Sequence, residues 1–129
     1  MINFRAVTKK NPRDLLADPL HYAAVISTGV SNLEKLSELA SRESSVGPQD
    51  CYSVLIGLAR AIELELKEGR IVELGQLGRF RVSVSSEGSE TSEEVSHTSI
   101  TKRRLIFSPS PYLKEVLVNL KFKKAPNQP

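Results

Sequence analysis

Glu68-Gly69-Arg70-Ile71-Val72-Glu73-Leu74-Gly75-Gln76-Leu77-Gly78-Arg79-Phe80-Arg81-Val82-Ser83-Val84 is the stretch that decides the fold. An apolar run at helical spacing ends at Gly69, and glycine most readily adopts the left-handed conformation that closes a helix. The chain then changes to alternation of period two, which predicts strands over residues 71–74 and 80–84. We expect a tight turn through Gly75 and Gly78 to join them.

The same turn is a candidate phosphate-binding element. Glycines at a turn let the backbone approach another group closely, and Arg79 and Arg81 stand beside it. Phosphate oxygens accept hydrogen bonds from backbone amides and from guanidinium groups alike. The turn therefore predicts a nucleic-acid backbone as its partner.

Two short motifs here resemble the HU and integration host factor group of bacterial histone-like DNA-binding proteins. That family runs from a helix-ending Lys-Glu-Gly through a strand into Gly-Phe-Gly-x-Phe, and this chain has Lys67-Glu68-Gly69 and then Gly75-Gln76-Leu77-Gly78-Arg79-Phe80. One residue is inserted, and Leu77 stands where an aromatic residue is usual. The resemblance covers about residues 30–121. It implies an α+β, HU-like fold with two helices, a three-stranded sheet with a long β-arm, and a carboxyl-terminal helix.

Residues 1–30 predict an additional strand pair, which shorter HU proteins lack, so the resemblance is to a longer subfamily with an amino-terminal extension. Residues 2–8 and 22–27 have β-compatible patterns. Between them lies a basic turn, whose Lys9, Lys10 and Arg13 would either contact DNA phosphate or simply be solvated.

The two helices are predicted from their ends. Ser31 and Glu34 have the spacing of a capping box, so the first helix should begin there and end near Ser44. Gly47 and Pro48 read as cap and first residue of a second helix, which runs to Glu68. Its apolar residues cover more than half of its circumference, which predicts a second subunit; the resemblance implies an intertwined homodimer.

Beyond Val84, residues 85–99 are small and polar and predict a flexible excursion, and residues 100–107 return as a strand. Residues 84–104 thus occupy the place of the family's β-arm. A last helix should start within Ser108-Pro109-Ser110-Pro111. The expected organisation is an amino-terminal β extension at 1–30, an HU-like DNA-binding domain at 31–121 and a disordered tail at 122–129.

Composition argues against several other functions. The 129-residue chain has a net charge of +3, with −3 in residues 31–69 and +4 in residues 70–129. It shows no signal peptide or membrane anchor, so a cytoplasmic location at the nucleoid is expected. Cys51, His21 and His97 have no partners at metal-ligand spacing, and no nucleotide-binding or hydrolase motif occurs. We expect no enzyme, cofactor, metal or small-molecule substrate.

The resemblance implies a non-sequence-specific, architectural DNA-binding protein, in which two arms of a homodimer reach into the minor groove of double-stranded DNA. The residues that correspond to its DNA contacts are Gly75, Gly78, Arg79, Arg81, Lys102, Arg103 and Arg104. Since successive strand residues alternate faces, at most two of the last three can serve one surface.

The arm departs from the family pattern, because four glutamates replace its cations and no proline occurs between residues 49 and 108 to wedge between base pairs. These carboxylates are Glu87, Glu90, Glu93 and Glu94. Phosphates would repel them, so two interpretations stay open. One is a weaker DNA binder that uses the base of the sheet; the other is an HU-fold module for protein interaction.

Overall fold

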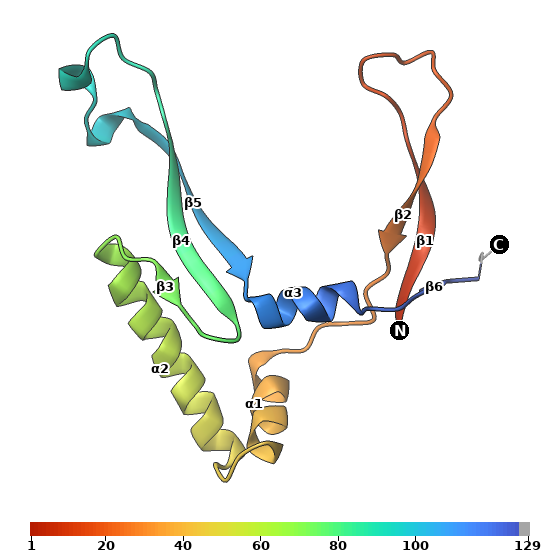
Figure 1. The fold of residues 1–129 in the computed structure, drawn as a ribbon, viewed down its shortest axis with the longest axis vertical. Coiled ribbons are helices and arrows are strands. Elements are labelled where there is room, and N and C mark those ends of the chain that lie inside the picture. The colour runs from red at the N-terminus through yellow and green to blue at the C-terminus, as the bar shows by residue number, and fades with distance from the viewer. Residues whose placement is uncertain (127–129) are drawn as a thin grey trace. The chain divides into compact units, whose positions relative to one another are not determined.

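The computed structural model describes residues 1–126, in which three α-helices and two three-stranded sheets form an α+β fold (Figure 1). The predicted α+β class is confirmed. The chain forms two compact units. The first comprises Met1–Ser31 together with the residues from Leu117 onward, and the second comprises Asn32–Val116.

The first unit is built from both ends of the chain. Strand β1 (Ile2–Lys9) pairs antiparallel with β2 (Leu20–Val25) and parallel with β6 (Phe122–Lys124), which gives the order β2-β1-β6. The amide of Ile2 donates to the Lys121 carbonyl over 2.8 Å, and the amide of Ala125 donates to the Phe4 carbonyl over 2.9 Å. Strand β6 satisfies the backbone groups of β1 on the side that β2 leaves open.

The prediction of a disordered tail at 122–129 was therefore wrong for residues 122–124. Three residues are too few to show an alternating pattern, and their partner strand lies more than a hundred residues earlier in the sequence. Residues 127–129 lie outside the described part of the chain.

In the second unit, α1 (Leu33–Arg42) packs against α2 (Pro48–Lys67). The predicted capping box of Ser31 and Glu34 was wrong: Asn32 is the N-cap, and its side-chain oxygen accepts from the Lys35 amide over 2.9 Å. Asparagine is at least as good an N-cap as serine, so residue type alone could not show which of the two neighbours, Ser31 or Asn32, caps the helix. The cap at Gly47 with Pro48 in the first turn is confirmed.

Helix α2 ends one residue earlier than expected, and Gly69 then has a φ of 75°, the left-handed conformation expected there. The chain continues into β3 (Val72–Glu73), β4 (Gly78–Ser86) and β5 (Ile100–Pro109), which form an antiparallel sheet in that order. The predicted turn between β3 and β4 is present: the Leu74 amide donates to the Gly78 carbonyl over 2.8 Å.

The segment between β4 and β5 has local structure, with two 3-10 turns, η1 (Ser92–Glu94) and η2 (His97–Ser99). We call residues 87–99 the arm tip. Helix α3 (Pro111–Val118) follows β5 and starts three residues after Ser108, because β5 continues through Pro109, which pairs with Gly78. The Ser110 hydroxyl accepts from the Leu113 amide over 3.2 Å and so caps this helix.

No apolar side chain is buried among the residues that the structure describes; the buried residues are Ser37, Gly78 and Ser110. The chain exposes 11342 Å². Two separate compact bodies of the sizes of the two units would expose about 8,000 Å². Each unit therefore leaves its apolar faces largely uncovered within one chain.

Candidate nucleic-acid interface

The register of β4 and β5 sorts the predicted cations between the two faces of the sheet. Directly opposed residues of antiparallel strands point to the same face, and successive residues point to opposite faces. Arg79 and Arg81 lie on one face of β4, where Ser83 pairs with Arg104 and Ser85 pairs with Lys102. We call this face, with its four cations, the cationic face: Arg79, Arg81, Lys102 and Arg104.

Arg103 lies on the other face, because it pairs with Val84. The pairs Val82–Leu105 and Phe80–Phe107 share that face, and the two phenylalanine rings are 5.1 Å apart between centroids. We call it the apolar face. Arg103 is thus separated from the other predicted strand cations, and Lys102 and Arg104 are the two of the three consecutive cations that serve one surface.

The cations of the cationic face differ in what they already bind. Arg79 is paired with Glu73, with 2.7 Å between Nη2 and Oε1, and Arg104 donates to the Ser85 hydroxyl over 2.6 Å. The Arg79 pair is more than half exposed, so water screens it and it contributes little stability. Arg81 and Lys102 make no ion pair with any described carboxylate. Among the described residues, an incoming phosphate therefore competes with one weak ion pair and one side-chain hydrogen bond on this face.

The β3–β4 turn and the start of α3 form an open hollow of about 440 Å³ beside the cationic face. Gly75 and Gly78 both have positive φ, and a Cβ at Gly78 would overlap the Ser108 carbonyl oxygen. The Ser110 amide donates to the Leu77 carbonyl over 3.2 Å, and its hydroxyl donates to the Gln76 carbonyl. These bonds attach the start of α3 to the turn.

Three cations line this hollow, and one of them, Lys114, was missed in the sequence. Lys114 lies in the first turns of α3, and its amide donates to the Ser110 carbonyl over 2.9 Å. The signal was its place four residues after the cap. That signal points to the hollow only once it is known that the first residues of α3 lie beside the β3–β4 turn. With Arg79 and Arg81 it gives the hollow a basic lining, broken by Glu73.

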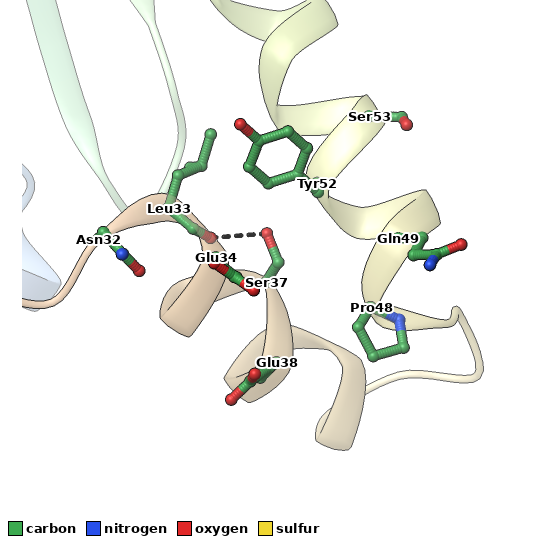
Figure 2. Close-up of a pocket in the computed structure, with 9 residues that line it drawn as sticks. All are labelled: Asn32, Leu33, Glu34, Ser37, Glu38, Pro48, Gln49, Tyr52 and Ser53. Carbon is green, nitrogen blue, oxygen red and sulfur yellow. Dashed lines mark hydrogen bonds between the residues drawn. The ribbon is translucent and has the colours of Figure 1, made fainter.

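A second hollow, of about 570 Å³, lies between α1 and α2 (Figure 2). Its lining has the opposite electrical character, with the carboxylates of Glu34 and Glu38 and no cation. The Ser37 hydroxyl donates to the Leu33 carbonyl over 2.7 Å, and the Tyr52 ring faces Leu33 across the hollow. Such a lining does not suit phosphate.

Among residues 1–126, no group of three potential metal ligands occurs. His21 lies on β2 opposite Thr8, and His97 lies in η2. No helix in the described part of the chain is long and apolar enough to cross a membrane.

Comparison with known proteins gives a family and a fold. The family model HU-HIG, described as "HU domain fused to wHTH, Ig, or Glycine-rich motif", matches residues 1–124. A crystal structure from Bacteroides vulgatus, described as a "Putative bacterial DNA binding protein", superposes with a TM-score of 0.68 at 11% identity. The match covers 99% of this chain and 50% of that one, so this chain spans about half its length. None of the curated proteins compared matches the chain.

Proposed function

Because the chain belongs to the HU-HIG family of HU domains, we propose that it is a DNA-binding protein of the HU type. It acts as a homodimer and holds double-stranded DNA on the cationic face without reading sequence. The observation that carries this proposal is the register of β4 and β5, which places Arg79, Arg81, Lys102 and Arg104 on one face.

Phosphate contact is the mechanism that this face supports. Alternate residues of a strand stand about 6.6 Å apart, so the two strands offer two rows of cations to the sugar-phosphate backbone. Such contacts release counterions and give affinity that depends strongly on salt but carries no sequence information. The amides and glycines of the β3–β4 turn, with Lys114, extend the same surface into the adjoining hollow.

Uncovered apolar surface supports the homodimer. On α2, Val54 and Leu64 are 67% and 64% exposed, although this helix is apolar around most of its circumference. On the apolar face of the sheet, Val82, Leu105 and Phe107 are about half exposed. Burial of such surfaces contributes about 25 cal/mol for each Å², and an obligate dimer interface resembles a core divided between two chains.

The acidic arm sets limits on the DNA complex. Glu87, Glu90, Glu93 and Glu94 are all exposed at the arm tip. Phosphates repel these carboxylates, so the duplex is held by the base of the arm. The same exposed carboxylates favour a second candidate function, an HU-fold module that binds a basic protein through the arm tip.

A gel-shift titration tests the proposal on a ~30-bp duplex at about 50 and about 200 mM salt. The variant Arg81→Gln/Arg104→Gln should weaken binding and flatten the slope of log affinity against log salt. The flattening is about 0.9 for each phosphate that the protein no longer neutralises, or about 3.6 for four such phosphates in a dimer. Arg103→Gln is the matched control on the apolar face and should leave the slope nearly unchanged.

Sedimentation equilibrium on the same samples should give about twice the chain mass of 14.3 kDa. Wild-type protein that fails to shift DNA at the lower salt would contradict the DNA-binding proposal. If replacing the four arm glutamates by glutamine then abolishes capture of a basic partner protein, the second candidate function is the correct one.

A further inference from the structure

The loop between β1 and β2, residues 10–19, presents two adjacent leucines to solvent. Leu15 is 73% exposed and Leu16 is 97% exposed. Single exposed leucines are ordinary on protein surfaces, but two neighbours at the end of a hairpin form a small apolar tip. We call Leu15 and Leu16 the leucine tip.

Side-chain hydrogen bonds hold the leucine tip outward. The Asn11 side chain accepts from the Arg13 amide over 3.0 Å, and the Asp14 side chain accepts from the Leu16 amide over 3.1 Å. The Asp14 amide also donates to the Asn11 carbonyl over 3.2 Å. The loop is therefore made of two successive side-chain-bonded turns. The exposure of the leucines follows from this turn chemistry.

A row of cations lies on one face of the sheet formed by β2, β1 and β6, and the row extends toward the leucine tip. Arg5 and Lys9 lie on one face of β1, and Lys123 of β6 joins them because it pairs with Asn3. Lys9 Nζ lies 5.5 Å from the centroid of the Tyr22 ring, on the neighbouring strand. Lys10 and Arg13 continue the series into the loop, where Asp14 and Asp18 are the acidic residues.

We propose that the β1–β2 hairpin is a second DNA-contacting element, whose cations bind phosphates while the leucine tip inserts between base pairs in the minor groove. Apolar side chains inserted in this way unstack a base step and kink the duplex. This inference rests on the proposed function and deepens it: bending is assigned to the first hairpin and backbone binding to the cationic face.

The spread of the cations favours DNA over a lipid surface. Arg5 and Lys9 are four residues apart, which is about 13 Å along a strand, and Lys123 lies beyond Arg5. A flat membrane that took up the leucine tip would meet Lys10 and Arg13 but not the row along the strands. A groove with phosphates along its edges can meet both.

The experiment measures bending and binding separately. A ~30-bp duplex with a donor and an acceptor dye at its two ends reports a kink of about 20–90° as a rise in energy transfer. Wild-type protein should raise the transfer at saturation. Leu15→Ser/Leu16→Ser should remove most of that rise, and Val30→Ser, which changes an apolar residue that is 93% exposed outside the hairpin, should not.

Lys10→Gln/Arg13→Gln should lower the salt slope by about 0.9 for each phosphate that the loop no longer neutralises, whereas Lys35→Gln on α1 should not change it. Saturated binding with full energy transfer in the leucine variant overturns the inference and leaves the proposed function intact. Failure of wild-type protein to bind DNA overturns both. Sedimentation with anionic phospholipid vesicles that depends on Leu15 and Leu16, together with unchanged DNA bending, would show that the loop binds membranes and overturn the inference.

Discussion

The two β-hairpins of this chain carry similar net charges but distribute them in different ways. The hairpin of β1 and β2, residues 2–25, has a net charge of +2, and the hairpin of β4 and β5, residues 78–109, has a net charge of +1. In the second hairpin, five cations lie on the strands and four glutamates lie at the tip. In the first hairpin, the loop carries two cations, Lys10 and Arg13, and two aspartates, Asp14 and Asp18, and apolar residues occupy the tip.

The difference shows that the position of charge along a hairpin decides what its end can contact. An acidic tip avoids phosphate whatever the net charge of its strands, because the interaction of exposed charges is screened beyond about 8 Å at physiological salt. The arm is therefore suited to DNA only near its base. The first hairpin keeps an end that is compatible with a groove.

The largest expected effect is a loss of stability, caused by a substitution at the base of the second hairpin. Gly78→Ala should lower the free energy of unfolding by about 3 kcal/mol, because the residue has a φ of 146° and its new Cβ would overlap the Ser108 carbonyl. Gly88→Ala is the matched control at the arm tip, where a Cβ meets nothing within 4 Å. It should change stability by less than about 0.5 kcal/mol. Urea unfolding at one fixed protein concentration measures the free energy of unfolding of both variants. Equal losses in the two variants would mean that the base of the arm is no more rigid than the arm tip.

A nearly equal effect is expected on affinity when the charge of the arm tip is reversed. Replacing Glu87, Glu90, Glu93 and Glu94 by lysine should tighten binding to a duplex by more than about a hundredfold at low salt and steepen the salt slope. Replacement by glutamine should give a smaller gain, since it removes repulsion without adding cations that bind phosphate. Gel-shift titration compares them. Unchanged affinity in the lysine variant would indicate that the arm tip does not lie near DNA in the complex.

Sequence reasoning succeeded where a local signal was sufficient. Gly69 indicated its left-handed conformation, Gly75 indicated a turn, and Gly47 with Pro48 marked the start of α2. It failed where the outcome depended on distant partners. Strand β6 exists because β1 offers an edge for it, and three residues carry no pattern of their own. Asn32 rather than Ser31 is the N-cap, and the two residues are neighbours of types that cap helices about equally well.

For the candidate site, the sequence indicated individual residues but not the surface that they share. Alternation alone showed that Lys102, Arg103 and Arg104 could not share one face, yet only the register identified Arg103 as the residue on the apolar face. Register could not be read from the sequence, because a bulge near Ser85 and Ser86 interrupts the pairing. Lys114 and the leucine tip were missed for a related reason: their exposure and neighbours depend on how the loops turn.

The smallest expected effects come from two substitutions, one at the end of each hairpin, which allow the two ends to be compared directly. Asn11→Ala removes the acceptor for the Arg13 amide, and Ser99→Ala removes the acceptor for the Ser96 amide, whose bond is 3.1 Å long. Both bonds are exposed, so exchange of each donor amide should quicken by no more than about fivefold, which is about 1 kcal/mol.

The consequences for DNA should nevertheless differ between these two variants. Asn11→Ala loosens the loop that holds Leu15 and Leu16 outward, so it should reduce the energy transfer of a saturated, end-labelled duplex. Ser99→Ala loosens an arm tip whose carboxylates keep it away from phosphate, so the transfer should stay at the wild-type value. A loss of bending in Ser99→Ala with none in Asn11→Ala would reverse the comparison, because the second hairpin would then be the element that deforms the duplex.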